Sequence, residues 1–514
     1  ALYAGAAVLG LMIVALASTA SHAVAWSDYS WRPGAPPPRI ERSHVDLAAW
    51  QDDKVDYRVA VTSRVQAEQV VAEHESPIWP LARCSAALVF ALLLSWLIGR
   101  SLSFLNRSSH HALYRARLVR AYLGASNKVR LDCVKGPSLT DEHEDDDVRM
   151  ADYWREGEAG PIGKGAPLHV INTTINETID GESQRQQQFR KGLMLAVGPA
   201  GLSAGVRHHL AVDWAIEKSP AKLRSTPLSD APYDVFSIPA GWRQMPGDKE
   251  AGPDLTRLLL GHWMAISGAA FSTGVGFRTN AAMSMLTGLS NVRLGYWWEA
   301  RRAIRQFGAG AWLLDQFRMQ GYLICELLGR FPGTAREHWY LSDGGHFENM
   351  GVYELIRRRL PRMVLVDAEQ DEGLRFEGLA NLVRKARLDF NADIEFPEHA
   401  EDVTRLVRAA GLPDGSAFTT LEELARRAGS PTAPNGESQS QNHAHASLAR
   451  IRYAQADGQA GAQEGWLIYV KPTLSGDEQV DVLQYRAENP AFPHQTTVDQ
   501  IFDEEQWESY RWLG

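Results

Sequence analysis

Residues 340–349 read YLSDGGHFEN, with an Asp-Gly-Gly directly after a short apolar run. The apolar run 339–341 predicts a short strand, and the Asp-Gly-Gly that follows predicts a tight turn, because glycine tolerates positive φ and the close approach of another group. Apolar spacing in 351–360 predicts a helix, and residues 363–366 predict a second strand. Asp343 would then lie at the carboxyl end of a strand, where open α/β sheets carry their chemistry.

Asp343 also has a purely structural interpretation. Aspartate is a preferred residue at helix N-caps and in turns, where its side chain accepts a backbone N–H. An isolated Asp-Gly-Gly favours that interpretation. A chemical role for Asp343 therefore depends on what the remainder of the chain contains.

Length and composition limit the number of domains, the class of partner and the cellular compartment that the chain can have. The chain has 514 residues and a mass of 57.0 kDa, enough for two or three domains or for one large domain with additions. Its net charge of −9 argues against nucleic acid as the main partner. Its three cysteines, Cys84, Cys133 and Cys325, are far apart and form no C-x-x-C. We therefore expect a reducing compartment, with no disulfide framework, metal site or other cofactor.

Two apolar segments near the N-terminus predict a transmembrane helical hairpin. Residues 1–26 contain no Asp, Glu, Lys or Arg, and about 20 such residues can span a bilayer. A signal peptide is the competing interpretation. The second uncharged run, 84–99, reaches a spanning length if the helix extends over 78–105 and flanking arginines snorkel. A buried core helix is the alternative for that run.

The flanking charges predict the orientation of the hairpin. Basic residues follow one another from Arg100 to Arg130, with no acidic residue before Asp132. The positive-inside rule then places the loop 27–77 outside the cytoplasm and residues 106–514 inside it. The chain begins with Ala-Leu-Tyr in place of Met, so we expect it to be a fragment of a longer protein.

Residues 106–514 alternate predicted strands and helices, which indicates an α/β domain. Strands are expected at 168–175, 193–197 and 465–471, and helices at 112–125, 378–390 and 497–513. The aromatic stretch 281–329 predicts helices that fill a core or bind acyl chains. The polar stretch 430–446 predicts a disordered loop. The acidic run 141–147 predicts a solvated loop, because it lacks the ligand alternation of a calcium site.

Two serines are candidate nucleophiles. Ser203 lies in GLSAG, the one literal G-x-S-x-G of the chain, a motif that can form the strand-to-helix elbow of a serine hydrolase. Three residues, Gly-Pro-Ala, separate this motif from the preceding apolar run, which does not suit an elbow. Ser267 lies in AISGA, a relaxed version with alanine in both glycine positions. For each serine the alternative is a small-residue turn that packs closely against its neighbours.

Residues 340–351, YLSDGGHFENMG, resemble the catalytic-aspartate motif of membrane-associated bacterial patatin-like phospholipases, which are related to the cytosolic phospholipase catalytic domain. The segments that support the resemblance are Tyr114-Arg115, RAYLG at 120–124, VINTT at 170–174, AISGAA at 265–270, NVRLG at 291–295 and FPHQTT at 492–497. The resemblance runs from about residue 105 to the end of the chain. It implies a patatin-like α/β/α sheet sandwich.

The resemblance also implies an activity. Patatin-like enzymes hydrolyse lipid acyl esters with a serine–aspartate dyad, a glycine-rich oxyanion loop and a G-x-S-x-G elbow. Asp343 would be the base that activates the serine. Gly344 and Gly345 would let the serine-bearing backbone approach, and Gly268 would help to shape the site. The expected substrates are phospholipids or lysophospholipids of the bacterial inner membrane, reached by a multi-pass protein with a cytoplasmic catalytic domain.

The chain departs from the family pattern in one respect, because no Gly-Gly-Gly loop precedes Ser203 or Ser267. The segment beginning at Ser267 resembles instead the Ser-Ala-Ala that follows the nucleophile in patatins. We therefore expect the nucleophile and its oxyanion loop upstream of Ala1, with Ser203 and Ser267 as alternatives. The rival hypothesis is a catalytically inactive patatin-like membrane scaffold that binds lipid or a partner protein. The sequence indicates no oligomeric state.

Overall fold

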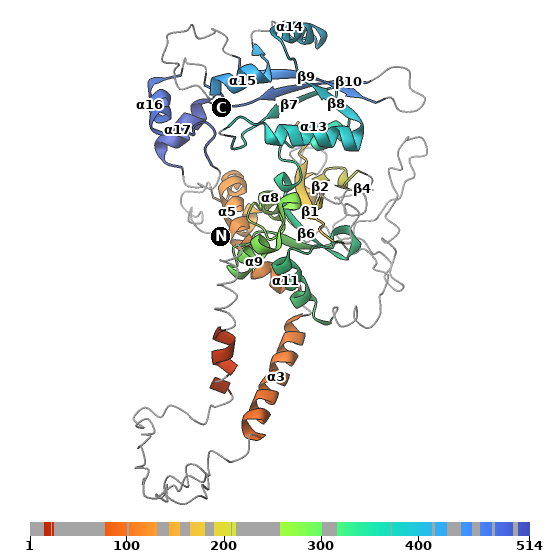
Figure 1. Ribbon diagram of the computed structural model, residues 1–514, viewed down its shortest axis with the longest axis vertical. Coiled ribbons are helices and arrows are strands. Elements are labelled where there is room, and N and C mark those ends of the chain that lie inside the picture. The colour runs from red at the N-terminus through yellow and green to blue at the C-terminus, as the bar shows by residue number, and fades with distance from the viewer. Residues whose placement is uncertain are drawn as a thin grey trace, which may run out of the picture. The chain divides into compact units, whose positions relative to one another are not determined.

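The computed structural model describes the following parts of the chain: residues 15–21, 23–24, 78–99, 102–130, 143–154, 165–179, 190–206, 208–211, 258–300, 316–371, 373–413, 417–428, 444–454, 463–474, 478–496 and 502–513. The chain divides into two compact units, one of residues 1–104 and 307–323 and one of residues 105–306 and 324–514. The larger unit contains two sheets with helices packed on them (Figure 1). The predicted α/β class is therefore confirmed as a mixed α/β fold.

The smaller unit contains α3 (Ile78–Gly99), a 22-residue apolar helix. Its segment Ala82–Gly99 has a mean hydropathy of 1.8, and by length and composition it could cross a membrane. Apolar side chains along it, such as Leu88, Phe90 and Leu93, are exposed, whereas a core helix of a soluble domain buries its apolar face. It is the single candidate span in the described part of the chain.

The other half of the predicted hairpin lies largely outside the described residues. Of residues 1–26, only 15–21 and 23–24 are described, and they are helical. The loop 27–77 is outside the described residues as well. The second predicted span, 78–105, is shorter than expected, because α3 ends at Gly99 and α4 (Leu102–Arg107) is a separate helix. The structure thus supports one candidate membrane helix, and a multi-pass topology stays a prediction.

The first sheet of the larger unit has six strands in the order β4-β3-β2-β1-β6-β5. They are β1 (Ile171–Asn176), β2 (Gly192–Gly198), β3 (Gly201–Ala204), β4 (His208–Ala211), β5 (Tyr296–Glu299) and β6 (His338–Asp343). All neighbouring pairs are antiparallel, and β6 pairs with β1 so that Asp343 lies opposite Thr173. The rule for open parallel sheets does not apply here, so Asp343 has to be judged by its own surroundings.

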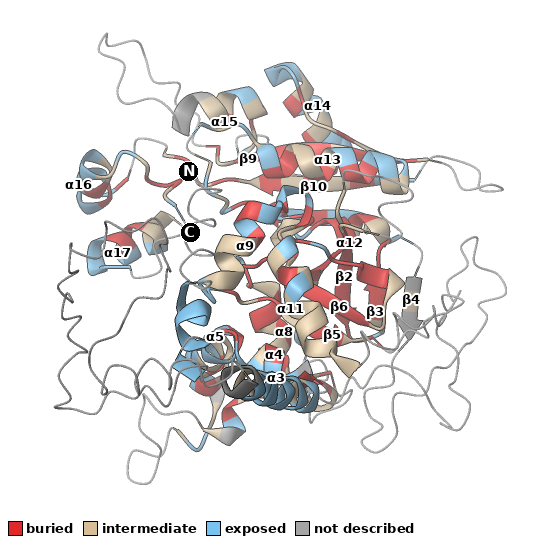
Figure 2. Cartoon of the chain, turned by 60° about the horizontal axis from the view of Figure 1, so that its bottom comes forward, coloured by how far each residue is buried: buried red, intermediate tan, exposed pale blue. Residues whose placement is uncertain are grey.

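The two faces of this sheet have different surroundings, because successive side chains in a strand point to opposite faces. One face carries Ile175, Leu195 and Leu341, which pack against α8 (Leu260–Ser267). Asp343, two residues beyond Leu341, belongs to this α8 face. Figure 2 shows that the strands β2 and β6 are buried through most of their length.

The second sheet has four strands in the order β7-β10-β9-β8. They are β7 (Arg362–Val366), β8 (Ala392–Glu395), β9 (Ala446–Tyr453) and β10 (Glu464–Val470), of which β7 and β10 run parallel. One face packs against α13 (Glu377–Phe390) and the other against α14 (Ala400–Ala409). Helices therefore cover both faces of this sheet (Figure 1).

The remaining helices surround these sheets or extend from them. They are α5 (His111–Leu118), α6 (Met150–Tyr153), α9 (Ala281–Leu289), α11 (Arg318–Leu328), α12 (Tyr353–Arg357), α15 (Leu421–Ala428), α16 (Val480–Glu488) and α17 (Glu504–Leu513). Single turns of π or 3-10 helix are η2 (Val119–Leu123), η3 (Gly124–Ser126), η4 (Glu144–Asp146), η7 (Gly276–Arg278), η8 (Gly333–Ala335) and η9 (Gly344–His346).

Several predicted elements need correction. The stretch 281–329, expected to be helical, contains strand β5, whose Trp297 and Trp298 are both buried. A strand buried on both faces shows no alternation, so the sequence pattern hides it. Of the predicted loop 430–446, residues 430–443 lie outside the described residues and Ala446 already begins β9. The acidic run is not simply solvated, because Asp146 is buried in an ion pair with Arg130.

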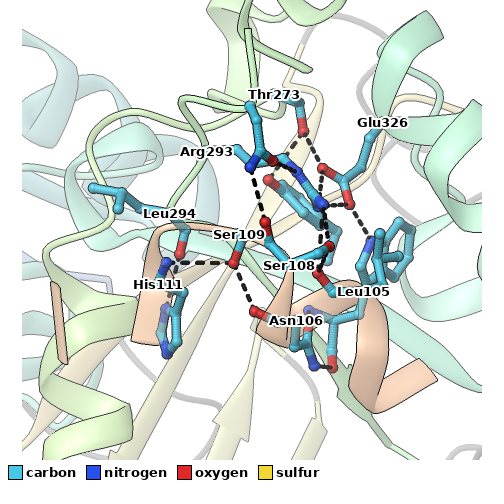
Figure 3. Close-up of polar contacts among 12 residues, drawn as sticks. Leu105, Asn106, Ser108, Ser109, His111, Thr273, Arg293, Leu294 and Glu326 are labelled. Atoms are coloured by element: carbon cyan, nitrogen blue, oxygen red, sulfur yellow. Dashed lines mark hydrogen bonds and ion pairs between the residues drawn. The ribbon is translucent and has the colours of Figure 1, made fainter. Parts of the chain in front are cut away.

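A buried ion pair holds the start of the larger unit in place (Figure 3). Arg293 Nη1 lies 2.9 Å from Glu326 Oε1, and Trp297 donates its indole N–H to the same oxygen at 2.8 Å. Burial raises the pKa of the Glu326 carboxyl, and the Arg293 guanidinium opposes that shift. Arg293 also donates to Ser108 Oγ at 2.9 Å. The pair therefore fixes the segment that precedes α5.

Asn106 adds a second attachment at the outer edge of the sheet. Its side-chain amide donates to the Trp297 carbonyl and accepts from the Trp297 N–H, both at 2.9 Å. β5 is the last strand of the sheet, so these backbone groups would otherwise lack a strand partner. His111 Nδ1, at the beginning of α5, lies 2.9 Å from the Leu294 carbonyl. Together these bonds set the position from which α5 starts.

Candidate active site around Asp343

Asp343 ends β6 and caps the short helix η9. The Gly345 N–H donates to Asp343 Oδ1 at 2.7 Å, the contact that an aspartate makes with the backbone two residues ahead in a turn. The structure therefore confirms that Asp343 caps the turn. It does not exclude a chemical role, because within the described residues only Oδ1 accepts a hydrogen bond.

The two glycines after Asp343 allow close packing. A Cβ on Gly344 would lie 2.6 Å from the carbonyl oxygen of Asn172 in β1, and a Cβ on Gly345 would overlap the Asn349 side chain. The resemblance predicted that the approaching backbone carries the nucleophilic serine. In the described part of the chain, the backbone that approaches Gly344 is that of strand β1, which pairs with β6. The approach of a serine-bearing backbone stays a prediction.

The electrostatics of Asp343 suit a base. Burial raises the pKa of its carboxyl to about 6, and the Gly345 N–H opposes this shift. The group is thus ionised at neutral pH and still basic enough to take a proton in a transition state. A carboxyl whose pKa burial moves toward the working pH is characteristic of functional sites, although structural carboxylates show such shifts too.

Neighbouring polar side chains hold the Asp-Gly-Gly turn. Asn176 donates to Ser342 Oγ at 2.8 Å, and Ser342 Oγ lies 2.9 Å from His346 Nδ1. Burial lowers the pKa of the His346 imidazole to about 4, and its bond to the Ala270 backbone opposes that shift. His346 is therefore neutral at pH 7 and links the turn to the segment after α8.

Ser267 and Gly268 lie close to this turn, as the α8 face requires. The Ser267 hydroxyl donates to the Asn172 carbonyl at 2.8 Å, the same oxygen that a Cβ on Gly344 would meet. Ser267 thus occupies the Asp343 side of the sheet, 76 positions earlier in the chain. Its one hydroxyl hydrogen is directed to the backbone and not to Asp343, so within the described residues it is not poised as a nucleophile.

Gly268 has a neighbour that the sequence did not single out as a site residue. A Cβ on Gly268 would lie 2.6 Å from the hydroxyl oxygen of Tyr114 in α5. Burial raises the pKa of Tyr114, and the charge of Asp343 raises it further. The only signal in the sequence was the Tyr114-Arg115 pair within the resemblance. The missing side chain of Gly268 leaves room for the Tyr114 hydroxyl, and the predicted role of Gly268 in shaping a site stays a prediction.

Ser203 is excluded as the partner of Asp343. It lies within β3, between the hairpin turn and Ala204, so the predicted strand-to-helix elbow is wrong. Leu202 and Ala204 belong to the α8 face, which directs Ser203 to the opposite face. Three strand spacings of about 4.8 Å also separate β3 from β6, roughly 14 Å.

Ser203 instead faces a histidine on the neighbouring strand. Its Oγ lies 3.0 Å from His209 Nδ1, and Arg357 in α12 contacts both ring nitrogens of His209. Burial and then Arg357 lower the pKa of His209 to about 4. A cation in the place where a catalytic triad holds a carboxylate favours a structural role for this pair.

Within the described part of the chain, no group of three or more His, Cys, Asp or Glu side chains could hold a metal ion. No protein-family model, no curated protein and no solved structure shows significant similarity to this chain.

Proposed function

We propose that this chain belongs to a membrane-anchored serine acyl hydrolase with a patatin-like fold, which cleaves phospholipid or lysophospholipid esters at the cytoplasmic face of a bacterial inner membrane. Asp343 is the base of its Ser–Asp dyad. The observation that carries the proposal is the half-buried Asp343 carboxylate at the end of β6, one oxygen of which accepts no hydrogen bond within the described residues. Burial raises the pKa of this carboxyl to about 6. The exposed apolar helix α3 supports a membrane anchor.

The nucleophile in this proposal is a serine other than Ser203 and Ser267. Ser203 lies on the opposite face of the sheet and roughly 14 Å from Asp343. Ser267 lies on the correct face but directs its hydroxyl hydrogen to Asn172. The dyad serine attacks the ester carbonyl while Asp343 takes its proton, and Asp343 returns that proton to the alcohol that leaves as the ester bond breaks. Water, deprotonated by Asp343, then cleaves the acyl-serine bond, which releases the fatty acid, and the proton returns to the serine oxygen.

The test compares wild type with Asp343→Asn in the purified full-length protein. The substrates are vesicles of phosphatidylethanolamine and phosphatidylglycerol, or micelles of their lysolipids, and the readout is released fatty acid. Loss of a general base should lower the rate by about 10²–10⁴-fold. Asp393→Asn, at an exposed carboxylate in β8, is the matched control and should keep the wild-type rate. Full activity of Asp343→Asn would refute the proposal.

A fluorophosphonate probe identifies the nucleophile directly. We expect it to label a serine in the wild-type protein, and peptide mapping should find that serine at neither position 203 nor position 267. Label on Ser267 would overturn the assignment of the nucleophile and would make Ser267 the partner of Asp343.

A catalytically inactive lipid-binding scaffold is the second candidate. One observation favours it, because no serine hydroxyl in the described part of the chain donates to Asp343. A scaffold would bind the same vesicles, resist the fluorophosphonate probe and release no fatty acid. The labelling experiment therefore separates the two functions.

A further inference from the structure

Tyr114 reaches the Asp343 side of the first sheet from α5, far away in the sequence. Its hydroxyl contacts Gly268, as the 2.6 Å approach to a Cβ there shows. The preceding residue, Ser267, binds the Asn172 carbonyl, and that oxygen also touches Gly344. Tyr114 is thus linked to the Asp-Gly-Gly turn through consecutive contacts of Gly268, Ser267 and Asn172.

The helix that carries Tyr114 is fixed on both sides of this residue. His111, one turn earlier, is bound to the Leu294 carbonyl at 2.9 Å (Figure 3). Arg115, the next residue, pairs with Asp147 at 2.6 Å, and Asp147 accepts the Gly261 N–H at the beginning of α8 at 2.8 Å. The same carboxylate therefore ties α5 to α8. Tyr114 is held in place before any substrate arrives.

The Tyr114 hydroxyl itself is not engaged. Within the described residues it neither donates nor accepts a hydrogen bond, and the residue is half-buried. Burial and the charge of Asp343 raise its pKa, so the phenol keeps its proton at neutral pH. A hydrogen-bond donor that is held in place and has no protein acceptor can stabilise negative charge that develops in a transition state.

We propose that the Tyr114 hydroxyl is a catalytic hydrogen-bond donor of this site, which binds the oxyanion that forms on the lipid ester carbonyl when Asp343 activates the nucleophile. The inference rests on the proposed hydrolase function. It adds a donor from α5, the helix whose start is fixed by the hydrogen bonds of Asn106 and Arg293. Tyr114 only donates a hydrogen bond in this step and transfers no proton.

The primary test measures fatty-acid release from phosphatidylglycerol vesicles by the full-length Tyr114→Phe variant. An oxyanion donor acts in the transition state, so kcat should fall about ten- to a hundred-fold while KM stays within about twofold. Tyr122→Phe, at an exposed tyrosine in η2, is the matched control and should retain both constants. An unchanged kcat in Tyr114→Phe, or a change confined to KM, would overturn the proposal.

Gly268→Ala gives an independent test that leaves Tyr114 in place. Gly268 has a φ of −100°, which alanine adopts without strain. Its new Cβ would displace the Tyr114 hydroxyl, so kcat should fall in the wild-type background and much less in Tyr114→Phe, which has no hydroxyl to displace. Losses that simply multiply in the double variant would show independent effects and contradict the proposal. If Tyr114→Phe does not fold, a wild-type kcat in Gly268→Ala contradicts it.

The Asp343→Asn variant separates failure of this inference from failure of the proposed function. If Tyr114→Phe hydrolyses lipid at the wild-type rate and Asp343→Asn is inactive, the proposed role of Tyr114 is refuted and the proposed hydrolase function is retained. An active Asp343→Asn refutes the hydrolase dyad and the role of Tyr114 with it.

Discussion

Arg293 and Glu326 form a buried ion pair at 2.9 Å, with side chains that are 5% and 0% exposed. Arg278 and Glu377 form a pair of the same length at the surface, where their side chains are 65% and 64% exposed. Removing one partner of a buried pair leaves an uncompensated charge out of contact with water, while an exposed pair exchanges its partner for solvent. The two pairs therefore separate the effect of burial from the effect of pairing.

Glu326→Ala should lower the free energy of unfolding by about 3–5 kcal/mol, because Arg293 would stay buried without its counter-charge. Glu377→Ala is the control and should change it by less than about 1 kcal/mol. Urea titrations followed by tryptophan fluorescence measure both values. Equal losses in the two variants would contradict a special role for the buried pair.

The rate of ester hydrolysis should follow the ionisation of Asp343. Only the carboxylate can accept a proton, and burial raises the pKa of this group to about 6. We expect kcat/KM to rise tenfold per pH unit below about pH 6 and to level off above it. The profile is measured with a soluble ester such as p-nitrophenyl butyrate, so that the physical state of the lipid does not change with pH. A flat profile between pH 4.5 and 7 would argue against Asp343 as the base.

Asp343 should also make the fold less stable as the pH rises. Its pKa is raised in the folded state from the ordinary 3.8 to about 6, so between these values the folded chain binds more protons than the unfolded chain. Stability from the protonated form is therefore present below about pH 4 and is lost as the pH approaches 6. Asp343→Asn cannot ionise and can still accept the Gly345 N–H. Its urea midpoint should match wild type at pH 4 and exceed it at pH 7.

Gly344→Ala should destabilise the protein by about 1–3 kcal/mol and abolish hydrolysis, because the new Cβ would press on the backbone of β1. Gly373→Ala is the matched control. The nearest atom to its Cβ would be Arg375 Nε at 3.3 Å, on a flexible side chain, so the change should stay within about 0.5 kcal/mol. Thermal unfolding compares the two variants, and a neutral Gly344→Ala would show that the turn has room to spare.

Membrane insertion of α3 can be tested as a segment in a two-span reporter protein. The segment Ile78–Gly99 should insert, and Leu92→Arg should oppose insertion by about 3 kcal/mol, because a charge near the centre of the bilayer is costly. Leu92→Ile keeps the segment apolar and should insert like wild type. Failure of the unmodified segment to insert would remove the support that α3 gives to a membrane anchor.

Local patterns predicted most elements near the candidate site. The apolar runs 339–341, 193–197 and 363–366 lie in strands β6, β2 and β7, and the stretch 378–390, predicted as a basic helix, lies in α13. Such patterns report which side chains an element buries, and that information is local. They did not report strand β5, because both of its tryptophans are buried and leave no alternation.

The sequence by itself therefore determined the turn at Asp343, the tight glycines and the apolar helix α3, because each depends on neighbours within a few positions. Only the tertiary structure decided which groups meet. Antiparallel pairing of β6 with β1 puts Asp343 on the α8 face, excludes Ser203 by the two-residue alternation of β3, and brings Tyr114 to Gly268. Which strands pair depends on burial and backbone hydrogen bonding across the whole fold, so it cannot be read from the residues of one segment.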